Sequence, residues 1–147
     1  MPAGYALPAL TGRVVDKADL LAPAQEASLS AQSAALEKAT GHQFVVVTVP
    51  DLGGHPIEDY GLHLGRYWGI GRKQVNDGVL LLVAPNERKV RIEVGYGLET
   101  TLSDPRAKTI IDRDILPAFR AGDMPKGIIA GAAAITHTLE PAGAKAT

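Results

Sequence analysis

The stretch from Asn76 to Asp104, NDGVLLLVAPNERKVRIEVGYGLETTLSD, carries the strongest β-strand signal in the chain. Residues 79–83 are an almost purely aliphatic run, which is typical of a strand buried on both faces. Residues 89–94 alternate charged and apolar side chains, which indicates a strand with one wetter face. The residues between them, Ala-Pro-Asn-Glu, supply turn chemistry, so the two strands are predicted to form a hairpin.

The predicted hairpin also indicates where a functional site lies. Because a hairpin brings its two outer ends together, Asn76 and Asp77, which precede the first strand, should lie beside residues 95–99, which follow the second. Two loops that carry glycines and acids then share one edge of the sheet. We interpret that edge as the candidate site.

Helical and strand patterns alternate along the rest of the chain. The predicted elements are an extended piece at 13–15, a helix at 23–39, a strand at 43–49, a helix at 56–68, the hairpin, a helix from Ser103 to Phe119 that Pro117 should end or kink, and a last helix at 125–139. Strands separated by helices imply parallel pairing with crossover connections. We therefore predict an α/β fold, a three-layer α/β/α sandwich whose mixed, mostly parallel sheet ends in a β-hairpin.

Size and composition indicate one folded domain. The chain has 147 residues, of which 46% are hydrophobic and 21% charged, with a net charge of −1. That charge balance and the 5% aromatic content argue against nucleic-acid binding. The absence of cysteine excludes disulfides, cysteine-ligated metals and a thiol nucleophile. We expect residues 1–10 to be disordered or an artificial extension, residues 11–140 to be a single domain, and residues 141–147 to be a flexible tail.

Common catalytic signatures are missing from the sequence. It has no Gly-x-Ser-x-Gly elbow, no phosphate-binding Walker loop and no His-Glu-x-x-His motif, and its four histidines are scattered. Asp112 and Asp114 form an Asp-x-Asp pattern, but inside a predicted helix, where residues two apart do not share a face. Gly95-Tyr96-Gly97 lacks the third glycine of a dinucleotide-binding loop, so we favour the interpretation that its glycines let the strand bend.

The carboxylates around the hairpin are the best candidates for chemistry. Asp77, Glu99 and Asp104, together with Asn76, offer the hard oxygen ligands that Ca²⁺ prefers. Asp16 is a weaker candidate for the same cluster. Two alternatives stay open, because Asp104 could serve only to cap its helix and Asn76-Asp77-Gly78 could be only a turn.

Five segments, in this order, resemble the TPM domain family, which occurs in a photosystem-repair protein of thylakoids and in bacterial envelope proteins. They are GRVVDKADLL (12–21), TGHQFVVVTV (40–49), YWGIGRKQVNDGVLLLVA (67–84), RKVRIEVGYGLE (88–99) and LSDPRAKTIIDRDILPAFRAGD (102–123). The GYGLE piece that follows the hairpin is the most specific of them. The resemblance implies an α/β/α sandwich, with the family's acidic loop positions falling on Asp77, Glu99 and Asp104.

The resemblance also implies a location and a function. It implies an extracytoplasmic protein, in the periplasm or anchored in the envelope, although no signal peptide is visible and no apolar run approaches the ~20 residues that span a bilayer. We expect a module that binds a divalent cation such as Ca²⁺ and an envelope or membrane protein partner. We further expect a monomer that meets the membrane only through segments absent from this chain. A metal-assisted acid phosphatase and a structural domain without ligand are the alternatives.

Overall fold

The computed structural model describes residues 2–140 and contains one four-stranded sheet with the strand order β1-β2-β3-β4. Strands β1 (Val14–Asp16), β2 (Gln43–Thr48) and β3 (Gly78–Ala84) run parallel. Strand β4 (Lys89–Val94) returns antiparallel to β3 and pairs Val79 with Val94. The predicted mixed sheet and its terminal hairpin are confirmed.

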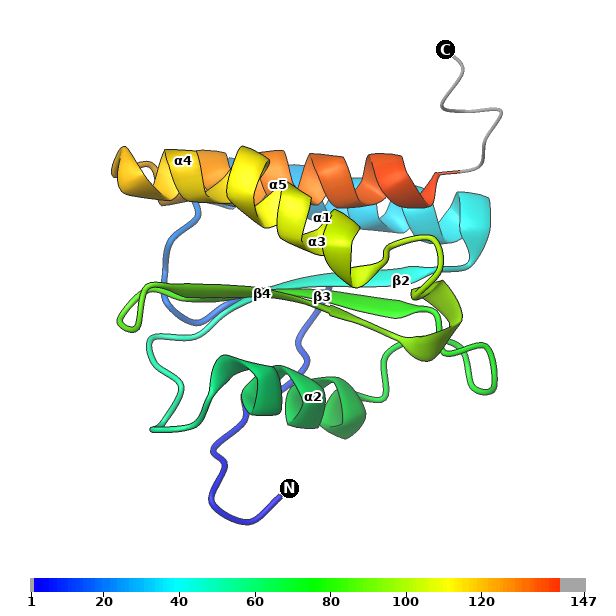
Figure 1. The fold of residues 1–147 in the computed structure, drawn as a ribbon, viewed down its shortest axis with the longest axis horizontal. Helices are drawn as coiled ribbons and strands as arrows, with labels where there is room; N and C mark the ends of the chain where they lie inside the picture. Colours follow the sequence, from blue (N-terminus) through cyan, green and yellow to red (C-terminus); the bar gives the residue numbers. More distant parts are fainter. Residues whose placement is uncertain (1, 141–147) are drawn as a thin grey trace.

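Helices cover both faces of this sheet (Figure 1). One face carries α1 (Pro23–Thr40), α3 (Asp104–Ile110), α4 (Leu116–Arg120) and α5 (Met124–Leu139), and the other carries α2 (Ile57–Trp68). A short 3-10 turn, η1 (Tyr96–Leu98), links β4 to α3. The three-layer sandwich is therefore confirmed, and no helix within residues 2–140 is both long and apolar enough to cross a membrane.

The sheet divides the apolar core into two layers. Every residue of β3 is buried, and its side chains alternate between the layers, with Leu81 facing the four-helix side and Leu80 and Leu82 facing α2. On β4 only one set of side chains joins the core, including Ile92, whereas Lys89 lies exposed. The aliphatic run and the alternating run thus correspond to a central strand and an edge strand.

Pro117 does not end its helix. A π-helical turn, η2 (Ile111–Ile115), joins α3 to α4, and the Leu116 N–H donates to the carbonyl of Ile111, five residues back. Proline lacks the N–H that an α-helical ladder needs, and the wider turn accommodates this loss. Helix α5 packs closely here, since a Cβ on Gly131 would lie 2.5 Å from Ile115 Cδ1.

The N-terminal segment packs against the rest of the domain, and the domain bounds that we expected stay a prediction. Leu7 is buried at 6% exposure in the core layer of α2, and Trp68 Nε1 donates to the carbonyl of Pro8 at 2.8 Å. Tyr5 stacks on His55 with ring centroids 3.8 Å apart. These contacts place residues 5–8 against α2 and the loop that precedes it. The tail predicted at 141–147 lies outside the described residues.

Candidate functional site

The hairpin joins the two loops that flank it. The Gly95 N–H donates to the carbonyl of Gly78 at 2.8 Å, and the Gly97 N–H donates to the carbonyl of Asn76 at 2.9 Å. The first bond extends the β3–β4 ladder, and the second ties the loop before β3 to the turn after β4. The central geometric prediction is therefore confirmed, because both acid-bearing loops lie at one edge of the sheet.

The glycines of Gly95-Tyr96-Gly97 are explained by this close approach of the loops. A Cβ on Gly95 would collide with the carbonyl oxygen of Asn76, and one on Gly97 would collide with that of Val75. Gly95 itself has an ordinary extended backbone, with φ −66° and ψ 155°. Space for a facing backbone, rather than an unusual bend, is therefore what these positions require.

Asp77 is the most buried acid at this edge. Its side chain is only 1% exposed, and it contacts Arg72 and His42. The Arg72 backbone N–H donates to Oδ1 at 2.7 Å and its Nε–H donates to Oδ2 at 2.9 Å, while Nη2 forms an ion pair with Oδ2 at 2.7 Å. His42 Nδ1 lies 2.9 Å from Oδ2, and since an ionised carboxylate only accepts, this nitrogen carries the proton.

These contacts decide the protonation state of Asp77. Burial alone raises the pKa of its carboxyl, but the hydrogen bonds from Arg72 and His42 outweigh burial and lower the pKa to about 2. The carboxylate is thus ionised at neutral pH. Three of these four nitrogen contacts are on Oδ2 and one is on Oδ1, so a metal ion at Oδ2 would have to displace a donor, and one at Oδ1 would have to reach a buried atom.

The other predicted acids are placed differently. Glu99 is exposed and lines a cleft, while Asp104 is exposed at the first position of α3, behind the capping residue Ser103. Asp16 pairs with Thr48 at the far end of β2, whereas Gly78 pairs with Gln43 at its start. Asp16 therefore lies roughly 17 Å away along the strands, at their opposite end. Its inclusion in the cluster is wrong.

The predicted metal ligands are Asp77, Glu99 and Asp104. Among residues 2–140, no group of three or more histidine, aspartate or glutamate side chains is placed to hold a metal ion. Glu99 is the one member of the predicted set that lines the cleft. The metal site stays a prediction.

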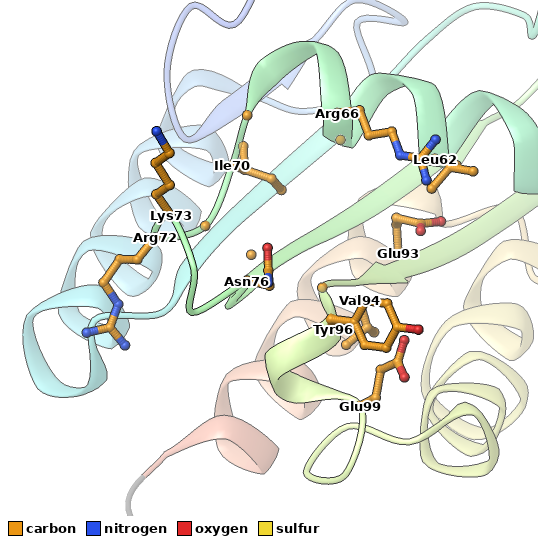
Figure 2. Close-up of a pocket in the computed structure, with 15 residues that line it drawn as sticks. Leu62, Arg66, Ile70, Arg72, Lys73, Asn76, Glu93, Val94, Tyr96 and Glu99 are labelled. Atoms are coloured by element: carbon orange, nitrogen blue, oxygen red, sulfur yellow. The ribbon is translucent and has the colours of Figure 1, made fainter.

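A cleft of about 590 Å³ opens at this edge, between the second half of α2 and the end of β4 (Figure 2). Leu62 and Arg66 come from α2, and Lys73 comes from the loop that follows it. Tyr96 and Glu99 come from the turn after β4. The volume lies within the range of about 300–1,000 Å³ that is usual for ligand pockets.

Sequence reasoning missed the basic residues of this cleft. It located the acids through the hairpin but gave no role to Arg66, Arg72 or Lys73. One available signal concerned Asp77: because β2 and β3 are parallel and Gln43 pairs with Gly78, the residues just before them, His42 and Asp77, must be neighbours. The place of Arg66 depends on how α2 lies across the sheet, which its sequence pattern does not specify.

The fold and the edge geometry can now be compared with known proteins. The TPM domain family model matches residues 14–138, which is most of the chain. The chain belongs to the TPM domain family. This confirms the resemblance carried by the hairpin and the GYGLE piece. No curated protein matches the chain.

Solved structures agree with this membership. A solution NMR structure of the N-terminal domain of a protein from P. gingivalis is 39% identical, with a TM-score of 0.82, covering 88% of this chain and 82% of that one. The BA42 protein from the psychrophilic bacterium Bizionia argentinensis is 19% identical, with a TM-score of 0.69 and 82% of each chain covered. The N-terminal domain of the cg2496 protein from Corynebacterium glutamicum is 14% identical, with a TM-score of 0.69, covering 94% and 90%. The last two show the likeness of fold alone.

Proposed function

We propose that this TPM domain is a binding module of the cell envelope that takes a divalent cation and a protein partner at the cleft beside Tyr96. The observation that carries the proposal is the distribution of charge at this edge. The most buried acid, Asp77, is neutralised internally by Arg72 and His42, whereas Glu99 is exposed on the cleft wall. The buried Asp77 holds the loops in place, and the exposed Glu99 can contact a ligand.

This distribution favours binding over hydrolysis. A metal-assisted phosphatase without a protein nucleophile needs carboxylates free to hold two metal ions against a phosphate. The Asp77 oxygens already accept hydrogen bonds, and Asp104 does not line the cleft. The phosphatase alternative therefore gains no specific support from the geometry, and we do not propose it.

For the cation we propose Ca²⁺, with Glu99 as its carboxylate ligand. Calcium takes about six to eight oxygens and accepts backbone carbonyls and water among them. Glu99 fits such a role because it is exposed, and Asp77 fits it poorly because its carboxylate is buried and bound to Arg72 and His42. A site with a single carboxylate belongs at the weak end of calcium affinities, with a Kd on the order of 10⁻⁴–10⁻³ M. Mg²⁺, which demands stricter geometry, should bind more weakly.

A Ca²⁺ titration followed by ¹H–¹⁵N NMR tests this proposal. We expect saturable shifts in the amides of residues 95–99 and of the facing loop, and their loss in Glu99→Gln. Glu58→Gln is the matched control, since Glu58 is equally exposed but lies in the first turn of α2, away from the cleft. Shifts that persist unchanged in Glu99→Gln, or no shift at millimolar Ca²⁺, would contradict the cation site.

The envelope location rests on family membership and is tested separately. We expect the natural protein, expressed in a bacterial host with its own flanking sequences, to be recovered with the periplasmic or membrane fraction. Recovery with the cytosolic fraction would refute the location without bearing on the cleft.

A further inference from the structure

The charges on the cleft walls are unevenly paired. Arg72 is bound to Asp77 at 2.7 Å, and Glu93 is bound to Arg91 at 2.9 Å. Arg66, Lys73 and Glu99 have no ion-pair partner among residues 2–140. Within this part of the chain, two unpaired cations therefore lie on the wall formed by α2 and its following loop, and one unpaired carboxylate lies on the wall formed by the turn after β4 (Figure 2).

Apolar surface separates these charges. Tyr96 is 80% exposed and Leu62 is 38% exposed, so each presents a large side chain that the fold itself does not cover. Both line the cleft, as does Ile70. A cleft that joins exposed apolar side chains to a few charged groups offers contacts that a single ion would not use.

The backbone of the edge strand β4 is unpaired beside the cleft, at Val94. In an antiparallel ladder, hydrogen-bonded and non-hydrogen-bonded pairs alternate along the strands. Gly95 donates to Gly78, so the neighbouring pair, Val94 with Val79, is of the non-hydrogen-bonded kind. The N–H and C=O of Val94 then point away from β3, toward the side where β4 has no further strand within residues 2–140. A peptide in extended form can pair with such an edge.

We propose that the cleft binds a short extended peptide segment of a partner protein, which carries an acidic group for one of the two cations, Arg66 or Lys73, and a basic group for Glu99. The peptide backbone pairs with Val94, and an apolar side chain between its charges packs on Tyr96. This inference rests on the proposed interaction function and names its ligand class. Because Ca²⁺ and the basic group share Glu99, calcium competes with the peptide.

A peptide selection in the presence of a chelator tests the inference apart from the cation site. The probe is a library of capped hexapeptides, each with one acidic, one basic and otherwise apolar positions, together with sets in which both charged positions are neutral, acidic or basic. We expect wild-type protein to enrich the peptides that carry both charges over the neutral set by at least about tenfold, the difference that roughly 1.4 kcal/mol makes. NMR shifts on adding an enriched peptide should include the amides of Val94 and Tyr96.

Charge reversal distinguishes specific recognition from nonspecific binding. The double variant Arg66→Glu, Lys73→Glu should change the enriched peptides, so that a basic residue replaces the acidic one. The control, Arg88→Glu, reverses an exposed charge in the β3–β4 turn, at the other end of the hairpin from the cleft. It should leave the selection unchanged. No enrichment by wild type, or the same enriched peptides in the double variant, would overturn the inference. A Ca²⁺ titration that fails while the selection succeeds would instead refute the cation site alone.

Discussion

Replacing Asp77 by asparagine should both destabilise the domain and change how its stability depends on pH. The asparagine would keep the shape of the side chain but lose its charge, and its amide group would face the N–H donors of Arg72 or His42. The native contacts lower the pKa of Asp77 from 3.8 to about 2, a difference of about 1.8 units. At about 1.36 kcal/mol per unit, the ionised carboxylate stabilises the fold by roughly 2 kcal/mol at neutral pH.

The sign of the pH effect follows from the direction of the shift. A carboxyl whose pKa is lower in the folded state contributes its full stability above the unfolded pKa of 3.8 and loses it as the pH falls toward about 2. Wild-type protein should therefore lose roughly 2 kcal/mol between about pH 5 and pH 2 through this group. The Asp77→Asn variant should lack that part of the acid dependence.

Urea unfolding at a series of pH values measures both effects. At pH 7 we expect Asp77→Asn to lower the free energy of unfolding by about 2–4 kcal/mol, because the lost charge and the facing donors add. Asp104→Asn is the control, since Asp104 is exposed in the first turn of α3 and its loss should cost about 1 kcal/mol or less. If Asp77→Asn costs less than the control and keeps the wild-type acid slope, the contacts of Asp77 do not hold the loops as argued.

Three further substitutions test the packing around the site, each by thermal unfolding. Gly97→Ala should lower the free energy of unfolding by more than about 2 kcal/mol, because the added methyl group meets a facing backbone carbonyl that cannot move alone. A stability equal to that of Gly12→Ala, where nothing lies within 4 Å of the added methyl group, would refute the close approach. Gly131→Ala should cost about 1 kcal/mol net, since the clash with Ile115 exceeds the gain in helix propensity; a rise in melting temperature would contradict it. Leu7→Ala should cost about 2 kcal/mol; no loss would mean that residues 2–10 do not belong to the folded domain.

The sheet was predictable because its signals are local. An aliphatic run, a turn and an alternating run lie within residues 79–94, and together they specify a buried strand paired with an edge strand. The hairpin then placed Asp77 beside the turn that carries Glu99 without any knowledge of side chains. The π-helical turn at Ile111–Ile115 was not predictable in the same way, because Pro117 is compatible with a kink, an end or a widened turn.

The partners of Asp77 show where local signals stop. His42 lies 35 residues away in the chain, and only the parallel register of β2 and β3 makes it a neighbour. Arg72 is only five residues away, but its loop folds back on itself through a backbone N–H to Oδ1. An acid between asparagine and glycine looks like an exposed turn residue in the sequence, and its burial follows from contacts that no pattern contains.

Arg72 connects the buried carboxylate of Asp77 to the cleft. Its side chain is 48% exposed and lines the cleft, while its backbone and guanidinium both hold Asp77. The loop that carries Lys73 and the carbonyl of Asn76 is therefore fixed from within the fold, and the turn after β4 is fixed in turn by the Gly97 N–H on that carbonyl. A site whose two walls are held this way loses little conformational entropy on binding. The buried acid thus supports recognition by positioning the walls, and contact with the ligand is left to the exposed charges.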